Sequence, residues 1–181
     1  MARKPLAVEK YEFHALTPKR WGDFEQILGP NGCAGCWCMW YRLAHKDFTQ
    51  AGKEGRREGL RTIVHSGFSP GIIAYADGIP AGWVALAPRE WYARLKTSKH
   101  LAPVDDQPVW SITCFYIHRN YRRLGLMERL LQAAIEHARG QGATMLEAYP
   151  LDVEGKMSPV QLFSGKSSVF YKLGFEQAAM R

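Results

Sequence analysis

The sequence contains no long hydrophobic run. No apolar stretch approaches the roughly 20 residues that a membrane-spanning helix needs. The opening segment, M-A-R-K-P-L-A-V-E-K, lacks the apolar core of a secretory signal peptide. We therefore expect a cytoplasmic protein with no membrane partner, whose cysteine thiols stay reduced.

The sequence also has little cysteine, and it lacks a complete zinc motif. Cys33 and Cys36 form a C-x-x-C pair, but no second C-x-x-C or H-x-x-x-H is present. Cys38 would supply a third ligand, with His45 or Cys114 as the fourth. A thioredoxin-type redox pair would need the motif at a helix start after a strand. The remaining interpretation is a buried aromatic segment with thiols filling its gaps, and we expect no metal.

What is present is typical of one globular domain with a real core. The chain has 181 residues, 46% of them hydrophobic and 23% charged, which predicts a single domain over residues 1–181. The net charge of +7 suits an acidic ligand, and it also suits nucleic acid. Because the chain has no recognisable nucleic-acid motif, we expect no nucleic-acid partner.

The central feature is a strand, a basic turn and a helix. Residues 109–117, V-W-S-I-T-C-F-Y-I, predict a buried strand, and residues 118–123 are abruptly polar and basic. From Leu126 onward the apolar residues recur at helical spacing up to Gly140. The apolar positions on this face are Met127, Leu130, Leu131, Ala134, Ile135 and Ala138.

This arrangement has a chemical use. The first amides of a helix lack intrahelical partners, and the helix dipole adds positive charge there. Gly125 lets a ligand approach the backbone, while Arg122 and Arg123 add charge. The turn is therefore a candidate phosphate or pyrophosphate site, although solvated arginines ahead of an ordinary helix would give the same pattern.

Two motifs resemble the GCN5-related N-acetyltransferase (GNAT) family. R-R-L-G-L-M at residues 122–127 is similar to the family's R/Q-x-x-G-x-G/A turn, and S-V-F-Y-K-L-G-F at residues 168–175 is similar to its late F-Y-x-x-x-G-F segment. The resemblance implies an α/β (α+β) fold. Its mixed, mostly antiparallel central sheet would be flanked by helices, with a splayed strand-turn-helix for the cofactor.

The resemblance also implies acetyl-CoA as the cofactor. A backbone amide of the central strand would polarise the thioester carbonyl, and the turn would hold the pyrophosphate. Met127 stands where the family usually has a small residue, but it still provides a backbone amide. The implied cofactor-binding residues are Phe115, Tyr116, Ile117, Arg122, Arg123, Leu124, Gly125, Leu126 and Met127.

Acetyl transfer to an amine needs a proton donor for the leaving thiolate and a base for the amine. By resemblance, transfer is direct and Tyr171 matches the family's acid; a phenol stays protonated at neutral pH. Glu147, within the apolar run M-L-E-A-Y, is our first candidate for the base.

Other candidates for the base are less favourable. The central-strand positions where many family members carry a carboxylate hold Ser111 and Thr113, which could position a water but take up a proton poorly. His118 and Asp152 are weaker candidates than Glu147.

The segment C-A-G-C-W-C-M-W-Y-R at residues 33–42 lies where the family folds a segment over the acceptor. By that analogy Trp37, Trp40 and Tyr41 line the substrate pocket. An aromatic pocket would suit an apolar or cationic amine. Exposed tryptophans would also suit a homodimer.

The remaining elements fit this fold. We predict a strand at residues 8–16, a helix starting at Pro18 with Thr17 as its N-cap, and a helix at 48–65. A hairpin over 71–88 turns at Asp77-Gly78, and a strand follows at 144–150. Ser167 or Ser168 caps a short helix, and residues 175–180 form a last strand.

The sequence thus predicts an acetyl-CoA-dependent N-acyltransferase that acts on a primary amine of a small molecule. The alternative is an acyl-CoA-binding module of the same fold with weak or no catalysis.

Overall fold

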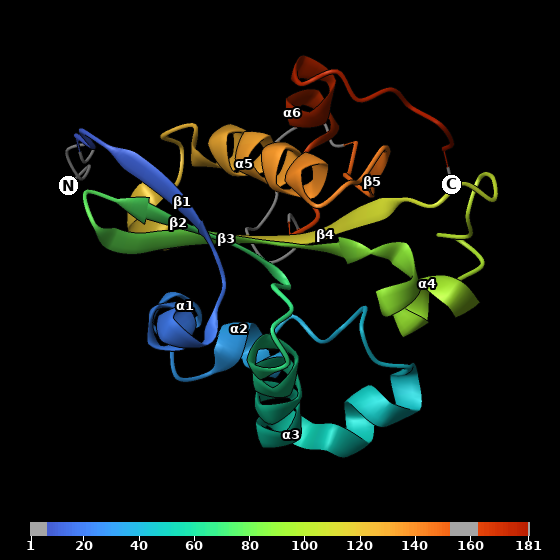
Figure 1. The fold of residues 1–181 in the computed structure, drawn as a ribbon, viewed down its shortest axis with the longest axis horizontal. Helices are drawn as coiled ribbons and strands as arrows, with labels where there is room; N and C mark the ends of the chain where they lie inside the picture. Colours follow the sequence, from blue (N-terminus) through green and yellow to red (C-terminus); the bar gives the residue numbers. More distant parts are fainter. Residues whose placement is uncertain (1–6, 153–162, 181) are drawn as a thin grey trace.

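A five-stranded sheet runs through the middle of the molecule (Figure 1). The computed structural model describes residues 7–152 and 163–180. The strands are β1 (Tyr11–Ala15), β2 (Gly71–Ala76), β3 (Ile79–Pro88), β4 (Trp110–Ile117) and β5 (Leu146–Ala148), in that order across the sheet. Residues 1–6, which contributed to the expectation of no signal peptide, lie outside the described part.

The sheet is antiparallel except at one edge. Neighbouring strands from β1 to β4 pair antiparallel, and β5 pairs with β4 in parallel. The predicted hairpin between β2 and β3 is confirmed, and both Asp77 (φ 49°) and Gly78 (φ 79°) have positive φ, as a tight hairpin turn of this kind requires. The mixed, mostly antiparallel sheet of the predicted α+β fold is therefore confirmed.

Helices cover both faces of the sheet (Figure 1). On one face lie α5 (Leu126–Gly140) and α6 (Ser167–Lys172). On the other lie α1 (Trp21–Leu28), α2 (Gly32–Gly35), α3 (His45–His65) and α4 (Ala93–Thr97). Because each face is apolar, the buried residues form one main core cluster on each side. No helix within the described residues is both long enough and apolar enough to cross a membrane.

An irregularity in β4 shapes its outer half. Ala85 pairs with Cys114 but Leu86 pairs with Ile112, so Thr113 is an extra residue, a β-bulge. Without a bulge Ile112 and Cys114 would share a face. Instead Ile112 packs on the α5 side, and Cys114 packs on the α1–α3 side. The bulge therefore turns Cys114 toward the face that carries α1 to α4.

The strands β4 and β5 separate beyond the bulge. Pairing with β5 covers only Trp110, Ser111 and Ile112. Further along, the Phe115 amide donates to the carbonyl of Phe163 at 2.6 Å, from a loop rather than from a strand. The splayed strand-turn-helix that the sequence predicts is therefore present.

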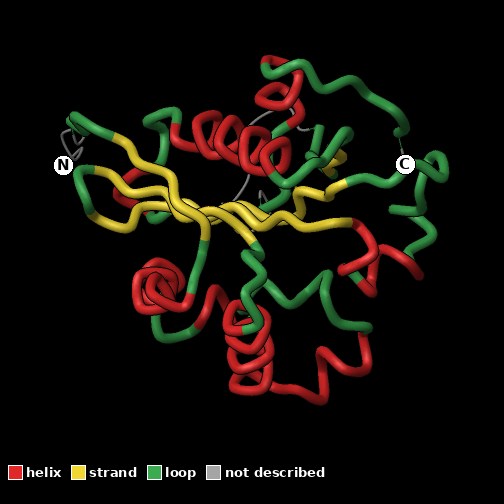
Figure 2. The backbone as a smooth tube through the Cα atoms, viewed as in Figure 1, coloured by secondary structure: helices red, strands yellow, loops and turns green. Residues whose placement is uncertain are grey.

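Several predicted boundaries differ from the structure. Residues 175–180 are a loop rather than a strand, as Figure 2 shows, and the strand expected at 144–150 shortens to β5. Thr17 and Pro18 take the expected N-cap and first helical positions, but of a short 3-10 helix, η1 (Pro18–Arg20), ahead of α1, and the Thr17 side chain makes no capping bond. Neither Ser167 nor Ser168 caps α6. Lys166 is its N-cap, and the Ser167 hydroxyl donates to Asp152 at 3.1 Å.

Candidate active site

The turn between β4 and α5 opens the helix start to solvent. Gly125 precedes α5 in the left-handed conformation with φ 74°, and a Cβ built there would meet no atom within 4 Å. Arg123 is exposed, also with positive φ, while Arg122 donates through Nε to the Ile117 carbonyl at 3.0 Å. Open space above the first amides of a 15-residue helix, with an exposed guanidinium beside it, fits a pyrophosphate.

Met127 does not fill that space with its side chain. It packs at the edge of the core, and a Cβ added to Gly165 would overlap its terminal methyl group and approach Phe170 at 2.9 Å. Because Gly165 has no side chain, the bulk of Met127 fits beside α6. Leu126 is buried in the core, so both residues face the turn mainly through their backbone.

The free edge of β4 lies next to this turn. The His118 amide donates to Ala81 on β3, whereas the Phe115 amide donates to Phe163 on the other side. Because amides alternate along a strand, the Ile117 amide faces the same edge as that of Phe115. The rings of Phe115 and Phe170 meet at 6.0 Å, while Tyr116 packs on the opposite face.

Tyr171 lies on the surface of α6. Its neighbour Phe170 fills the core, whereas the Tyr171 side chain is 49% exposed and its hydroxyl donates to Gln177 at 3.2 Å. Lys172 pairs with Glu128 in the first turn of α5 at 3.3 Å. This exposed pair links α6 to the first turn of α5, and the neighbouring Tyr171 is itself exposed.

Glu147 is the centre of a hydrogen-bonded network. Its Oε1 pairs with Nη1 of Arg89 and accepts from the hydroxyls of Ser111 and Tyr149, each at 2.5 Å. Arg89 also donates to the Leu101 carbonyl. Burial, followed by the bond to Glu147, raises the pKa of Tyr149 above its ordinary range. Glu147 therefore anchors the segment around α4 to the sheet, and proton uptake at Oε1 would disturb these bonds.

The weaker candidates for the base lie elsewhere. His118 caps a short 3-10 helix, η3 (Arg119–Tyr121), and burial and then Arg119 and Arg122 lower its pKa. Asp152 accepts the bond from Ser167.

Of the three aromatic residues expected to line the acceptor pocket, Tyr41 lies nearest the open end of the sheet. Its ring stacks on Tyr149 at 6.5 Å and meets Phe163 at 6.4 Å. Trp40 is 39% exposed and packs on Phe48. Trp37 is 3% exposed and stacks on Trp21, so the structure places it in the core rather than in a pocket.

The cysteines are free thiols on the same side of the sheet. Burial raises the pKa of Cys33 to about 11 and also raises that of Cys36. A hydrogen bond with Cys114 and burial raise the pKa of Cys38 well above its ordinary value. Among residues 7–152 and 163–180, no three side chains of the metal-binding types converge on one point.

Arg42, Arg89 and Tyr92 were not among the residues expected to form the site. Arg42 is 6% exposed and lies over the Tyr92 ring, with its Cζ 4.7 Å from the ring centroid. Tyr92 is fully buried. One sign of Arg42 was present in the sequence: a charged residue ends the apolar and aromatic run C-M-W-Y-R, where a buried segment would not be expected to carry a charge.

Comparison with known proteins identifies the family. The profile of the acetyltransferase (GNAT) family matches residues 37–154, which is most of the chain and includes the turn and the Glu147 network. The chain therefore belongs to the GNAT acetyltransferase family. A search of curated protein sequences gave no significant match.

Solved structures of acetyltransferases share the fold. Aminoglycoside N-acetyltransferase AAC(6')-Iy, solved with CoA, aligns over 99% of this chain and 95% of its own, with 14% identity and a TM-score of 0.56. An aminoglycoside acetyltransferase from an uncultured soil metagenomic sample aligns over 95% of both chains, with 17% identity and a TM-score of 0.56. A GCN5-related N-acetyltransferase from Ralstonia eutropha covers 95% of this chain and 96% of its own, with 13% identity and a TM-score of 0.53.

Proposed function

We propose that the protein is an acetyl-CoA-dependent N-acyltransferase that moves an acetyl group directly to a primary amine of a small molecule. The observation that carries the proposal is the Gly125-capped start of α5 beside the splayed edge of β4. Acetyl-CoA needs a binding site for its pyrophosphate. Its thioester carbonyl needs a hydrogen-bond donor, such as a backbone amide at the free edge of β4. Neighbouring structures solved with CoA and with a CoA-based bisubstrate analogue support the same ligand.

The chain's own residues supply the remaining chemistry. When bound, acetyl-CoA supplies an activated acetyl group. The amides of residues 125–127 and the Arg123 guanidinium would hold its phosphates, and the Ile117 amide would donate to the thioester carbonyl oxygen. Glu147, through Oε2 or through a water held by Ser111, accepts the proton of the amine. Tyr171 donates its phenolic proton to the departing sulfur, for which its bond to Gln177 must open.

The second candidate is an acyl-CoA-binding module without catalysis. The bonds on Glu147 Oε1 and the bond from Tyr171 to Gln177 favour it, because both proposed proton-transfer groups already have partners. Binding of acetyl-CoA without any acetylated amine would identify this candidate.

The deciding experiment is a calorimetric titration with acetyl-CoA, with free coenzyme A and adenine nucleotide alongside, followed by a panel of amines. Micromolar binding and product formation would support the transferase. No binding at millimolar acetyl-CoA would overturn both candidates.

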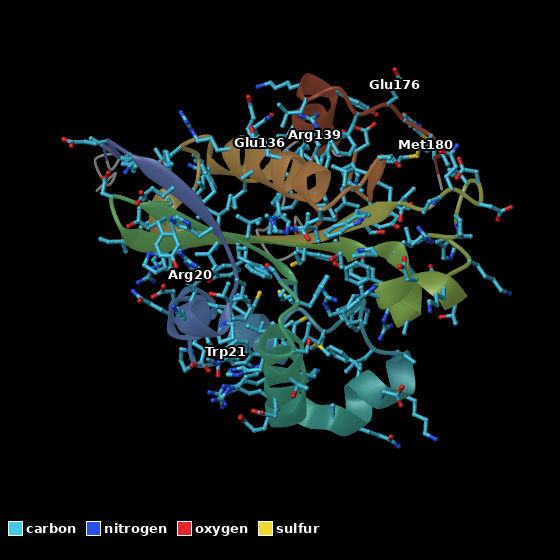
Figure 3. All side chains as sticks on the ribbon, in the orientation of Figure 1. Arg20, Trp21, Glu136, Arg139, Glu176 and Met180 are labelled. Carbon is cyan, nitrogen blue, oxygen red and sulfur yellow. The ribbon has the colours of Figure 1, made fainter. Side chains whose placement is uncertain are left out.

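Arg123→Glu tests the phosphate seat, because it places a negative charge beside the phosphates. We expect weaker acetyl-CoA binding with the fold retained. The matched control is Arg139→Glu, which makes the same charge reversal at the far end of α5; Figure 3 shows Arg139 on that helix. Equal affinities in the two variants would remove the phosphate role of Arg123. The cytoplasmic location, a homodimer and the absence of nucleic-acid partners remain predictions from the sequence.

A further inference from the structure

Arg42 carries a buried charge whose hydrogen-bonding capacity is largely unused. Its Nη2 makes two long contacts, 3.4 Å to the Pro70 carbonyl and 3.5 Å to the Tyr92 hydroxyl. Its Nε and Nη1 are buried and have no hydrogen-bond partner among the residues that the structure describes. A guanidinium stays charged at every physiological pH, and burying it without acceptors is costly. Such a group points to an acceptor that arrives with a ligand.

None of the groups around Arg42 supplies a negative charge. Among the described residues no carboxylate pairs with it. The neighbouring Cys38 stays a neutral thiol, because Cys114 and burial hold its pKa high. Burial likewise raises the pKa of Tyr92, although Arg42 and a hydrogen bond with Thr113 oppose the rise. The counter-charge is therefore not provided by this part of the fold.

The position of Arg42 connects it to the acceptor side of the site. The Tyr92 ring lies beneath the Arg42 guanidinium, and the Tyr92 hydroxyl makes a hydrogen bond with Thr113 at the β4 bulge. Tyr92 also belongs to the small buried cluster against which Tyr41 and Tyr149 pack. Arg42 thus lies one aromatic ring away from the point where β4 and β5 separate.

A second arginine adds to the positive charge there. Arg94 follows the same aromatic segment: its backbone amide donates to the Tyr41 carbonyl, its Nε donates to Trp40, and its Nη2 is buried without a partner. Among the described residues, the carboxylate of the neighbouring hydrogen-bonded network is that of Glu147, and it is already paired with Arg89. The acceptor side therefore carries more positive than negative charge.

We propose that the acceptor is an amine that also carries an anionic oxygen group, a carboxylate or a phosphate, and that Arg42 is the residue that selects it. The anionic group accepts from Nε and Nη1 of Arg42 while the amine faces the gap where β4 and β5 separate. This inference rests on the proposed function and narrows its substrate class. It also disfavours polycationic acceptors, which would meet Arg42 and Arg94 without a matching acid.

The test uses pairs of amines that differ in one anionic group. β-Alanine is compared with β-alaninamide for a carboxylate, O-phosphoethanolamine with ethanolamine for a phosphate, and an aminoglycoside serves as the polycation. The proteins are the wild type, Arg42→Met, the charge-retaining Arg42→Lys, and Arg61→Met as an exposed arginine control on α3. Acetyl-CoA binding is first verified for each protein by calorimetry.

We expect the wild type to show at least tenfold higher kcat/KM for the anionic member of one pair, and that pair identifies the group. Arg42→Met should lose the preference, while its kcat/KM for the member without the anionic group changes less than about twofold. Arg42→Lys should keep part of the preference. A wild type that prefers the amine without an anionic group, or the polycation, would overturn the proposal. Equal losses on both members in Arg42→Met would mean that Arg42 is only structural, which also overturns it.

A second measurement separates this inference from the proposed function. The anionic amines alone should raise the melting temperature of the wild type and of Arg61→Met but not that of Arg42→Met. If acetyl-CoA binds and no amine is acetylated, the transferase proposal fails, and these melting shifts still decide whether Arg42 holds an anionic group. The absence of any shift in the wild type at saturating amine would refute the role of Arg42.

Discussion

Replacing Glu147 with glutamine should weaken the fold as well as the chemistry. The ion pair between Arg89 and Glu147 is largely buried, since the two side chains are 11% and 23% exposed. Removing one charge from a buried pair costs about 3–5 kcal/mol. Glutamine keeps an oxygen that can accept from Ser111 and Tyr149, so we expect the lower end, about 3 kcal/mol. For a chain of this size that corresponds to a fall of about 6–12 °C in melting temperature.

Urea denaturation followed by circular dichroism would measure this loss. Glu136→Gln is the matched control, because Glu136 is an exposed carboxylate on α5 that accepts a hydrogen bond from Gln132, and it lies on the other side of the sheet from α1 to α4 (Figure 3). Adding Arg89→Met to Glu147→Gln should recover part of the loss, since no unpaired charge then remains.

Steady-state kinetics of Glu147→Gln test whether Glu147 takes part in catalysis. If Glu147 accepts the amine proton, kcat should fall by about 100-fold or more with acetyl-CoA affinity unchanged. Loss of stability with unchanged kcat would show that Glu147 is only an anchor for α4. A free energy of unfolding within about 0.5 kcal/mol of the wild type would refute the argument from the buried pair.

Three further changes test other parts of the site. Tyr171→Phe should lower kcat by about 100-fold without changing acetyl-CoA affinity, as measured by steady-state kinetics and calorimetry; unchanged kcat would remove the acid role. Gly165→Ala should destabilise the fold by about 2–4 kcal/mol, because φ is +88° and the new methyl group meets Met127, and adding Met127→Ala should recover part of it in urea titrations; strict additivity would refute that contact. Burial raises the pKa of Cys33 to about 11 from an ordinary value of 9.0, so the folded state favours the neutral thiol. The contribution of Cys33 to the free energy of unfolding should therefore be fully present below pH 9 and be lost as the pH rises toward 11. Stability should fall less over this range in Cys33→Ala, and identical pH profiles of the two proteins would contradict this.

Local patterns predicted the central unit well. The change from strand-like residues at 109–117 to helical spacing after Gly125 gave α5 its bounds, because a buried helix face requires that period. The Asp77-Gly78 hairpin followed from the positive φ that a tight turn demands. Short elements at the ends were predicted less well. The expected strand at 175–180 had suitable residues, but within the described part of the chain no strand pairs with it.

The site divides in the same way. The candidate phosphate turn could be located from the sequence, because the features that suggest it are local: a glycine, two arginines and a helix start. The acceptor side could not, because its residues come from distant segments. Whether Trp37 lines a pocket or fills the core depends on how α1 and α2 pack, and no periodicity in its own segment determines that.

The sequence by itself determined the family, the order of the elements and the position of the turn between β4 and α5, since each depends on residues close together in the chain. Only the tertiary structure decided that β4 bulges at Thr113, that Glu147 pairs with Arg89, and that Arg42 is buried with no carboxylate of the described residues paired to it. Glu147 and Arg89 are 58 positions apart in the sequence. Contacts of that kind depend on how strands and helices pack, and packing is a property of the whole fold rather than of any segment.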